Sequence, residues 1–580
     1  MPDERVLRQL TEALLFERMA TWPSERYAPY GGVDRPISFR VGPCTYRCQG
    51  RVGAFGRVRV VSGSIRKVTR RRLRETSWWE LLEDLPAEAS VRATLTEELA
   101  STARLCRYDR GLSRLRRSRR NLPYDELESS LHEGHPYHPC FKARTGFSLA
   151  DHAQYGPEAG NVFGLRWLLV QRDSLHQTLP TAELQHLRAE LTPEDFAALE
   201  RAWLGAAGRA DYGVLPVHPW QWRALAGTPA VQAALERREL VDLGLELGRY
   251  RASLSLRTLV PVDRPHASHV KLPLNVRISS SWRTLAPETV KTAPAASRWL
   301  ESLVAGDAFF ERVAGALVLA EHASSAYAPR ADASELSTQL AVIWRRPVTP
   351  ALRTGERATP FSALFALERD GRPFVDAWLA RHGILAWVGR LLRVTLLPLW
   401  RLLSHHGVAL ESHAQNLILL HEEGWPQRLA LRDFHDSLEY VPSFLAEPER
   451  APRWGELDPR FAAAPLGRYY AMSSLVELRD LFIDAVLIFN LTELSWLLER
   501  HYGFAERVFW RLARAVLVEH CRSAWGNPER EAQLRPFAPY VHTESLFKAR
   551  IRTSHGTPLH HVVPNALTEQ AEKEIHAEHR

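Results

Sequence analysis

Residues 405–439 read HHGVALESHAQNLILLHEEGWPQRLALRDFHDSLE, and the rest of the chain is interpreted around them. Two short apolar runs flank a Glu-Glu-Gly turn at residues 422–424, a pattern typical of a β-hairpin. Asn416 would enter this hairpin and Asp433 would leave it, so we expect the two ends to lie close together. If the chain before the hairpin is extended, side chains two residues apart point to one side, namely those of Glu411, His413 and Gln415.

A carboxylate, an amide and a second carboxylate would then meet at the mouth of the hairpin. Such hard oxygen ligands suit Mg²⁺ bound to nucleotide phosphates. Kinase-type phosphotransferases build a comparable site from a catalytic loop and a metal-binding Asp. The alternative is a polar loop beside an ordinary hairpin, which is the usual meaning of a single Glu or Asp. Four closely spaced polar residues followed by Arg432-Asp433 favour the site.

The length and composition are those of a globular protein with several domains. At 580 residues the chain is too long for one hydrophobic core, so we expect two or three domains. The hydrophobic content of 45% and the charged content of 24% exclude a disordered or fibrous chain. The net charge of +8 fits an anionic small molecule as well as nucleic acid. Basic clusters at 66–74 and 114–120 lack interleaved aromatic residues, so we expect no nucleic-acid binding.

The sequence predicts neither a disulfide framework nor a structural zinc site. The cysteines are odd in number, scattered and without a Cys-x-x-Cys pair: Cys44, Cys48, Cys106, Cys140 and Cys521. The N-terminal residues are charged and amphipathic and lack the apolar core of a signal peptide. The most apolar stretch, residues 384–403, contains two arginines and Pro398, which indicates a buried helix rather than a membrane span. We therefore expect a cytoplasmic protein that does not bind a membrane.

Hydrophobic periodicity divides the chain coarsely. Apolar residues at four-residue spacing predict a first helix within residues 3–20. Residues 347–373 are rich in Pro, Thr and Arg and are predicted to link two large halves. Residues 374–404 are predicted to be helical with a break near Pro398, and residues 470–520 to form a helical core.

A Gly- and Pro-containing stretch at residues 134–146 reads GHPYHPCFKARTG. Its two His-Pro pairs force an extended or turn backbone at each His, and its terminal glycines allow the backbone to approach a ligand closely. Lys142 and Arg144 are two residues apart, so on an extended segment they would share a face and bind an anion. The alternative is a Pro-rich loop between domains.

Two antiparallel strands are predicted at residues 253–258 and 270–278, separated by a turn at Asp263-Arg264-Pro265. Apolar and polar side chains alternate along both strands, so one face of the sheet is apolar and the other is rich in hydroxyls and cations. The polar side chains expected to face one cavity are Ser255, Arg257, Lys271, Ser279 and Arg283. Such a face fits a polyphosphate, whose charge must be neutralised before its α-phosphate is attacked. The alternative is a solvated sheet face.

Taken together, these motifs resemble the IucA/IucC family of NRPS-independent siderophore (NIS) synthetases. The matching segments, in the order found in the family, are GHPYHPCFKARTGF, PVHPWQW, SLSLRT, HVKLPLNVRISSSWRT, HGVALESHAQNLILL and LRDFHD. A further segment near residue 550, FKARI, looks like the family's C-terminal Met-Arg-Leu element. The resemblance covers most of the chain.

The resemblance implies an α+β fold shaped like a cupped hand. It would comprise a thumb-like region at 1–130, a fingers-like domain with an ATP-phosphate-binding sheet at 131–370, and a palm-like domain with the catalytic hairpin at 371–580. The implied enzyme is a ligase that uses ATP and Mg²⁺ to adenylate a carboxylate of citrate, or of a citryl or related polycarboxylate intermediate, with release of pyrophosphate. An amine or hydroxyl substrate then displaces AMP to give an amide or ester. Homodimers are common in families like this.

The resemblance also implies roles for individual residues. The triphosphate would be held by Ser255, Arg257, Thr258 and Lys271. The nucleotide site would also include Arg283, Gln415, Asn416 and Asp433. Substrate carboxylates would be bound by Ser279, Arg283 and His413, with Lys142 and Arg144 as additional candidates. Catalysis would depend on Lys271, Arg283 and His413, and Mg²⁺ would be held by Glu411 and Asp433.

Two positions depart from the family pattern. Ser279 stands where the family often has Thr, a change that keeps a hydroxyl. Glu544 falls where a Lys is often seen, although Arg550 is retained. The contact made to the amine or to the nucleotide edge would therefore differ at Glu544.

Two other functions fit parts of the pattern. A kinase-like phosphotransferase would explain the Arg-Asp-Phe at 432–434, but it predicts ADP, whereas the synthetase predicts AMP and pyrophosphate. A non-enzymatic siderophore-binding or iron-handling protein would explain a loose resemblance of the C-terminal half to ferric-siderophore reductases. Those reductases use clustered cysteines near the C-terminus, and Cys521 stands alone in this sequence.

Overall fold

The computed structural model describes residues 2–24, 33–70, 72–279, 281–329, 336–552 and 559–568. Its N-terminal elements are α1 (Pro2–Phe16), β1 (Arg35–Val41), β2 (Cys44–Val52), β3 (Val58–Val60), β4 (Arg66–Thr69), β5 (Arg72–Glu75), α2 (Trp78–Glu83), α3 (Ala89–Asp109), α4 (Tyr124–Ser130) and α5 (Leu149–Tyr155). The strands form an antiparallel sheet in the order β1-β2-β4-β5, and β3 pairs with β2. The first predicted helix is confirmed as α1.

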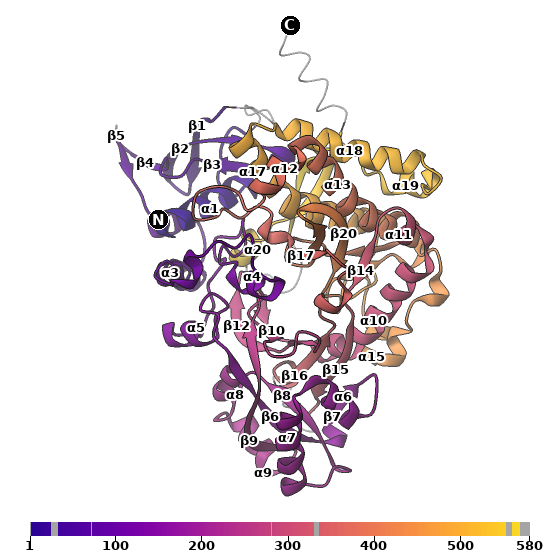
Figure 1. Cartoon of the computed structure of the whole chain (residues 1–580). Helices are drawn as coiled ribbons and strands as arrows, with labels where there is room; N and C mark the ends of the chain where they lie inside the picture. The colour runs from indigo at the N-terminus through magenta and orange to yellow at the C-terminus, as the bar shows by residue number, and fades with distance from the viewer. Residues whose placement is uncertain are drawn as a thin grey trace.

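The middle of the chain forms, within the described residues, an eight-stranded antiparallel sheet at the lower end of Figure 1. Its strand order is β7-β15-β16-β11-β10-β9-β6-β8. The elements of this region are β6 (Phe163–Gln171), β7 (Leu175–Thr178), α6 (Glu183–Glu190), α7 (Pro193–Ala206), β8 (Tyr212–Val217), α8 (Pro219–Leu225), α9 (Pro229–Glu236), β9 (Leu240–Ala252), β10 (Thr258–Pro261), β11 (His269–Lys271), β15 (Glu321–Tyr327) and β16 (Ala341–Arg345).

Helices cover both faces of this sheet. Leu168 and Val170 of β6 belong to one apolar core, which includes residues of α8 and α9. Trp167 and Leu169 belong to a second core, which includes residues of α6 and α7. Because strand side chains alternate between faces, the apolar run of β6 supplies both cores. The sheet that contains β10 and β11 is therefore packed against helices on both faces.

The two strands predicted over residues 253–278 are only partly correct. Residues 253–257 form the turn between β9 and β10 rather than a strand. Ser side chains favour such turns by bonding the local backbone, and the Ser255 hydroxyl accepts a hydrogen bond from the Thr258 amide at 3.0 Å. The second strand is divided at Pro273, which has no N–H for a sheet ladder, into β11 and β12 (Leu274–Ile278). β12 pairs with β13 (Ser281–Arg283) in a separate ribbon.

The hairpin predicted in residues 405–439 is confirmed. β19 (Leu417–Glu422) and β20 (Trp425–Leu431) pair antiparallel within a four-stranded sheet of described residues, in the order β14-β20-β19-β17. β14 (Ala316–Val318) runs parallel to β20, and β17 (Arg357–Pro360) pairs with β19. The prediction that residues 347–373 are a linker is therefore wrong, because they supply an edge strand to this sheet. The sheet draws strands from both sides of residue 370.

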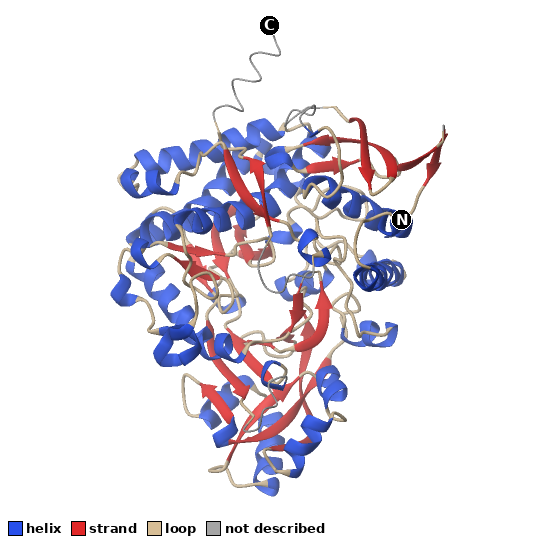
Figure 2. Cartoon of the chain, turned by 180° about the vertical axis from the view of Figure 1, so that it is seen from behind, coloured by secondary structure: helices blue, strands red, loops and turns tan. Residues whose placement is uncertain are grey.

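Helices α10 (Pro287–Gly306) and α13 (Ile384–Arg401) pack against this second sheet, as expected for an α+β fold (Figure 2). The other helices that follow β13 in the sequence are α11 (Ala308–Arg312), α12 (Asp376–His382), α14 (Trp454–Leu457), α15 (Pro459–Ala463), α16 (Leu475–Phe482), α17 (Thr492–Tyr502), α18 (Glu506–Arg522), α19 (Pro528–Leu534) and α20 (Lys548–Ile551). The remaining strands are β18 (Val408–Leu410), β21 (Leu438–Tyr440), β22 (Tyr540–Glu544) and β23 (His560–Pro564). The predicted helix break lies at Gly383 (φ 76°), between α12 and α13, and not at Pro398, which lies inside α13.

The N-terminal and C-terminal parts share one hydrophobic core, which contains residues of α1, the N-terminal sheet, α13, α17 and α18. Buried ion pairs reinforce this contact, since Arg57 and Arg59 both pair with Glu493, at 2.8 and 2.9 Å.

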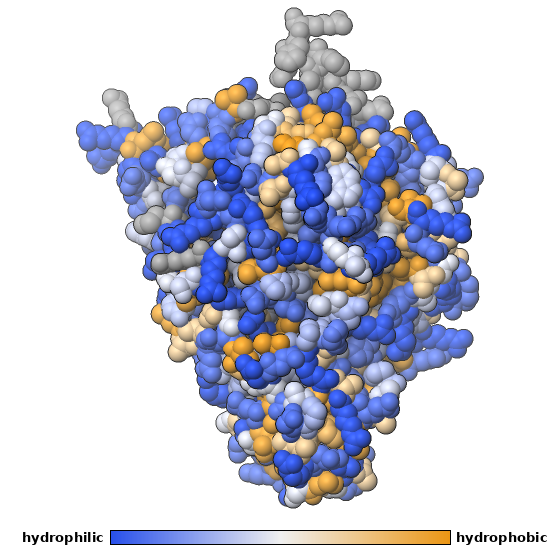
Figure 3. All heavy atoms as spheres, in the orientation of Figure 1, coloured by the Kyte–Doolittle hydropathy of each residue, from blue (hydrophilic) through white to orange (hydrophobic). Residues whose placement is uncertain are grey.

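In the part of the chain that the structure describes, one helical stretch, Leu475–Tyr502, is long and apolar enough to cross a membrane. The bent pair Asp376–His382 and Ile384–His406 passes the same test if it is taken as one span. The apolar window of Leu475–Tyr502 is 83% buried inside the protein, as expected of a core helix. The face in Figure 3 is mostly hydrophilic, with apolar side chains scattered over it.

Candidate active site

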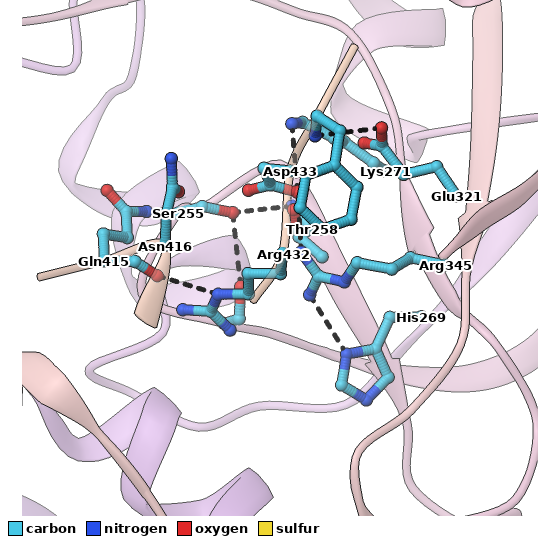
Figure 4. A network of polar contacts seen from close by, with 12 residues as sticks. Ser255, Thr258, His269, Lys271, Glu321, Arg345, Gln415, Asn416, Arg432 and Asp433 are labelled. Atoms are coloured by element: carbon cyan, nitrogen blue, oxygen red, sulfur yellow. Dashed lines mark hydrogen bonds and ion pairs between the residues drawn. The ribbon is translucent and has the colours of Figure 1, made fainter. Parts of the chain in front are cut away.

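The eight-stranded sheet and the hairpin meet at Asp433, directly beyond β20. Asp433 Oδ1 lies 3.3 Å from Lys271 Nζ and 2.7 Å from Arg345 Nη1. Lys271 ends β11 opposite Thr258 of β10, so the sheet register places these two side chains together. Figure 4 shows Lys271, Thr258 and Arg345 gathered around Asp433. The predicted approach of the cationic strands to the acidic hairpin is therefore found in the structure.

The neighbouring charges and burial set the pKa values of Asp433 and Lys271. Burial alone would raise the pKa of Asp433, but Lys271, Arg345 and Arg432 outweigh it and hold this pKa well below its usual range. Burial lowers the pKa of Lys271, and Asp433 opposes that shift. Asp433 has a left-handed backbone (φ 64°), a conformation that Asp tolerates better than most residues. The chain thus leaves the hairpin with an ionised carboxylate directed at the sheet.

The residues before the hairpin are not extended, so strand alternation does not align Glu411, His413 and Gln415. Residues 411–416 form a loop and turn between β18 and β19. The turn is closed by the Asn416 amide, which donates to the His413 carbonyl at 2.9 Å, and by the Asn416 side chain, which donates to the Glu411 carbonyl at 2.9 Å. Arg432 Nε donates to the Gln415 carbonyl at 2.7 Å. Local backbone bonding, rather than strand alternation, brings these residues together.

His413 and Glu411 lie at the solvent-accessible side of the site. Their side chains are 33% and 49% exposed, and His413 Nε2 lies 4.0 Å from Glu411 Oε1. The enclosing protein raises the pKa of Glu411 to about 7, and the nearby Asp436 carboxylate contributes to the rise. Burial lowers the pKa of His413 to about 4, so its ring is neutral at pH 7.

Two polar side-chain atoms of the site lack partners within the described residues. Thr258 Oγ1 and Arg283 Nε are shielded from solvent and have no hydrogen-bond partner there. Burial, with the like charge of Arg257, lowers the pKa of Arg283 to about 10. Arg283 Nη2 donates a hydrogen bond to Ser279 Oγ at 3.5 Å, so these two side chains meet beside the β12–β13 ribbon. Unpaired donors beside uncompensated cations fit an anionic ligand with many oxygens.

Lys142 and Arg144 lie in a separate buried cluster. Lys142 Nζ lies 2.5 Å from Asp109 and 2.8 Å from Glu158, and Arg144 also pairs with Glu158 at 2.8 Å. Of the extended and turn backbones predicted for this stretch, turns are found at residues 139–142 and 145–146, and Arg144 has a φ of 43°, so strand alternation does not align the two cations. Buried carboxylates already neutralise both cations, so neither side chain is available to bind a substrate carboxylate.

Sequence reasoning missed several residues of the site. Arg345 lies in an apolar strand that gives no local signal of a site. Glu321 of β15 accepts hydrogen bonds from the amides of Phe434 and His435, at 3.1 and 3.0 Å, and from the His435 ring at 2.7 Å. Asp436 is half exposed and contacts His435 Nε2 at 3.0 Å. In the sequence, the one sign that Asp436 belongs to the site is its place in the motif Arg-Asp-Phe-His-Asp, three residues after Asp433.

Two family models match this chain. The model for the IucA / IucC family matches residues 123–366, and that for the ferric iron reductase FhuF-like transporter matches residues 385–567.

Relatives of known name match over much more of the chain. Citryl-spermidine/3,4-dihydroxybenzoyl-citryl-spermidine:spermidine ligase of Bacillus anthracis is 32% identical over 578 residues, which is 97% of this chain and 93% of that protein. Aerobactin synthase of Escherichia coli is 32% identical over 431 residues, 73% of this chain and 72% of that protein.

Solved structures show the same fold. The petrobactin biosynthesis protein AsbB of Bacillus anthracis superposes with a TM-score of 0.89 and 30% identity, covering 99% of this chain and 96% of AsbB. Aerobactin synthetase IucC of Klebsiella pneumoniae superposes with a TM-score of 0.81 and 25% identity, covering 98% of each chain. The ATP-bound aerobactin synthetase IucA of the same species, at 18% identity and a TM-score of 0.77, shares the fold.

The sequence match to the Bacillus anthracis ligase and the superposition on AsbB both extend over nearly the whole chain. The cupped-hand α+β fold expected of NIS synthetases is thereby confirmed. This chain belongs to the IucA/IucC family of siderophore synthetases, and it is an enzyme of siderophore biosynthesis.

Proposed function

We propose that this enzyme uses ATP to adenylate a carboxylate of citrate, or of a citryl intermediate, and then joins it to an amine or hydroxyl. The ion pair between Lys271 and Asp433 carries the proposal, since it joins the cationic sheet to the acidic hairpin at 3.3 Å. A nucleotide needs both features, because its phosphates take cations and its metal takes carboxylates.

The triphosphate would be bound where the sheet offers unpaired donors. Thr258 Oγ1 and Arg283 Nε have no partner in the described residues. We propose Arg257 for the same group, because the carboxylates of Asp436 and Asp433 oppose the lowering of its pKa by burial. Cations fixed in a partly desolvated site stabilise charge that develops at phosphorus more strongly than water does. Ser255 would contribute by shaping the turn before Thr258.

The substrate carboxylate would be bound by Arg283, Ser279 and His413. His413 Nδ1 accepts a hydrogen bond from the Gln415 amide at 3.2 Å, so the proton of the neutral ring resides on Nε2. Nε2 can then donate to a carboxylate oxygen, while the Arg283 guanidinium provides the charge. Gln415 and Asn416 would line the nucleotide side of the same turn.

The proposed reaction has two steps. A carboxylate oxygen of the acid attacks the α-phosphorus of ATP, the bond between this phosphorus and the bridging oxygen breaks, and pyrophosphate leaves. The nitrogen of the amine, or the oxygen of a hydroxyl, then attacks the acyl carbon. The bond from this carbon to AMP breaks, AMP leaves with the electron pair, and the nucleophile loses a proton. Lys271, Arg257 and Arg283 would stabilise the negative charge in the first step.

We propose three carboxylates near this site as ligands of a divalent cation. Asp436 and Asp433 both act to raise the pKa of Glu411, which shows that the three lie within electrostatic range. Oxygen ligands of this kind suit Mg²⁺. Asp433, Glu411 and Asp436 would hold the ion, although Asp433 would share its oxygens with Lys271 and Arg345. When bound, Mg²⁺ would neutralise phosphate charge and orient the α-phosphate.

The named relatives suggest the first substrates to test. The Bacillus anthracis ligase is named for citryl-spermidine and spermidine, so citrate, citryl-spermidine and polyamines come first. We also propose that the enzyme acts in the cytoplasm on these small molecules, as a homodimer and without nucleic acid. Identifying the nucleotide products by chromatography tests the proposal. AMP and pyrophosphate formed only with acid present support it, and ADP would instead support a kinase-like phosphotransferase.

The FhuF-like match to residues 385–567 favours a second candidate, an iron-handling protein. Such a protein would bind a ferric siderophore without consuming ATP. Among the described residues of that region, Cys521 is the single cysteine, and it is free and partly exposed. Titration with a ferric citrate-based siderophore tests this candidate, and saturable binding without nucleotide turnover would support it.

A further inference from the structure

One edge of strand β12 has no partner strand among the described residues. The other edge pairs with β13, and Arg283 of β13 lies opposite Leu274. On the edge without a strand, the amides of Asn275, Arg277 and Ser279 all donate to groups outside the ribbon. Ser279 directly follows β12, so the contacts along this edge determine where both proposed ligands of the acid lie.

The His-Pro stretch supplies two of these contacts. The Arg277 amide donates to Thr145 Oγ1 at 2.8 Å, and the Thr145 amide donates to the Arg277 carbonyl at 3.2 Å. The Ser279 amide donates to the Cys140 carbonyl, also at 3.2 Å. The turns at residues 139–142 and 145–146 therefore take the place of a third strand. The Thr145 hydroxyl acts as the acceptor that a backbone carbonyl provides in an ordinary sheet.

Gln221 of α8 supplies the third contact and is fully buried. Its Oε1 accepts a hydrogen bond from the Asn275 amide at 2.8 Å, and its Nε2 donates to the Gln339 carbonyl at 3.2 Å. The Leu285 amide, two residues after β13, donates to the Thr338 carbonyl at 3.0 Å. Both strands of the ribbon are thus attached to the segment that leads into β16, an inner strand of the eight-stranded sheet.

Ser279 needs this support because its backbone is left-handed, with a φ of 52°. Ser rarely adopts this conformation, which persists only where neighbouring contacts hold it. The Ser279 hydroxyl also donates to the Ile278 carbonyl at 2.7 Å and accepts from Arg283 at 3.5 Å. A shift of β12 would therefore move Ser279 and Arg283 together. Displacing such a ligand by about 1 Å can lower a reaction rate about a hundredfold.

We propose that Thr145 is a positioning residue for the acid substrate. Its hydroxyl and amide hold β12 at Arg277, two residues before Ser279, and act through the ribbon on Ser279 and Arg283. The inference rests on the proposed adenylating function, and it adds a residue that places the acid ligands. It also gives the His-Pro stretch a role other than the anion binding predicted from its cations.

ATP–pyrophosphate exchange tests the proposal, because it gives the KM for the acid and the KM for ATP separately. Citrate and citryl-spermidine are the acids used. Thr145→Val removes the hydroxyl and keeps the side-chain shape, whereas Thr145→Ser keeps the hydroxyl. Gln221→Met weakens the same edge of β12 at its other contact. Thr192→Val is the matched control, because the Thr192 hydroxyl also accepts a backbone amide, from Asp195 at 3.2 Å at the start of α7.

In Thr145→Val we expect the KM for the acid to rise about tenfold, the effect of losing one hydrogen bond that orders a ligand site. The KM for ATP should stay within about twofold of wild type, since Lys271 and Asp433 lie outside the ribbon. Thr145→Ser and Thr192→Val should keep both values, and Gln221→Met should behave like Thr145→Val. A loss of folded enzyme would instead lower kcat and leave both KM values unchanged.

An unchanged KM for the acid in Thr145→Val would overturn the positioning role. An equal rise of both KM values, or a similar rise in Thr192→Val, would also overturn it. If Thr145→Val does not fold, Gln221→Met decides by the same criteria. Absence of exchange with every acid in wild type would instead overturn the proposed function, and the positioning role with it.

Discussion

Lys271 Nζ lies 3.3 Å from Asp433 Oδ1, which joins an inner strand of the eight-stranded sheet to the exit of the hairpin. Arg345, on the neighbouring strand β16, also pairs with this carboxylate, and its Nη1 lies 2.7 Å from Asp433 Oδ1. Three segments distant in the sequence therefore converge on one acid. The proposed nucleotide site depends on this convergence.

Replacing this acid should affect both stability and catalysis. Asp433→Asn leaves Lys271 and Arg345 buried without a counter-charge, and we expect a loss of about 3 kcal/mol in the free energy of unfolding. The ATP–pyrophosphate exchange rate should fall about a hundredfold or more, because the ordered charges around the phosphates are lost. Urea unfolding and the exchange assay measure the two effects. Asp263→Asn, in the exposed pair with Arg249, is the control. An exchange rate close to wild type in Asp433→Asn would contradict the assigned role.

Arg283 and His413 should be needed for the acid substrate. In Arg283→Ala and His413→Ala we expect pyrophosphate release that depends on the carboxylate to be lost, because charge and hydrogen bonding to the acid are removed. Far-UV circular dichroism should show an intact fold. Arg249→Ala, with its exposed side chain, should behave as wild type. Unchanged release in either variant would remove that residue from the site.

Thr258→Val should have opposite effects on stability and ATP use. Its buried hydroxyl has no partner among the described residues, so replacing it with a methyl group should leave the free energy of unfolding unchanged or raise it by up to about 1 kcal/mol. The KM for ATP should rise about tenfold, because one hydrogen bond to the triphosphate is lost. Thermal unfolding and initial rates give the two numbers. A destabilised variant with a normal KM would show that Thr258 has only a structural role.

The hairpin was predictable because a turn with Gly between two apolar runs is a local signal. The partners of Asp433 were predictable only in part. Lys271 was found through alternation along a strand, whereas Arg345 belongs to an apolar strand whose pairing with β11 no local pattern reveals. The residues before the hairpin reach the site without an extended backbone, since the Asn416 amide and side chain close a turn instead.

The His-Pro stretch shows a second limit of sequence reasoning. Lys142 and Arg144 resemble anion ligands in the sequence, but the acids that neutralise them, Asp109 and Glu158, come from other segments. A cation that binds substrate and one that binds a buried acid look the same until the chain is folded.

Lys142 should therefore be essential to stability rather than to substrate binding. Lys142→Met leaves Asp109 and Glu158 without its charge, and we expect a loss of about 3 to 5 kcal/mol in the free energy of unfolding. Arg453→Met, whose parent side chain is 83% exposed, should change this free energy by less than about 0.5 kcal/mol. Urea titration compares the two variants. A stable Lys142→Met protein with a raised KM for the acid would restore the residue to the substrate site.

The most direct test of the account follows oxygen from the acid into the nucleotide. Citrate or citryl-spermidine labelled with ¹⁸O in its carboxylates is incubated with the enzyme, ATP, Mg²⁺ and a polyamine, and the products are analysed by mass spectrometry. An acyl adenylate formed beside Lys271 and Asp433 predicts one ¹⁸O atom in AMP and none in pyrophosphate. Label found in inorganic phosphate together with ADP, or unlabelled AMP formed along with the condensed product, would contradict it.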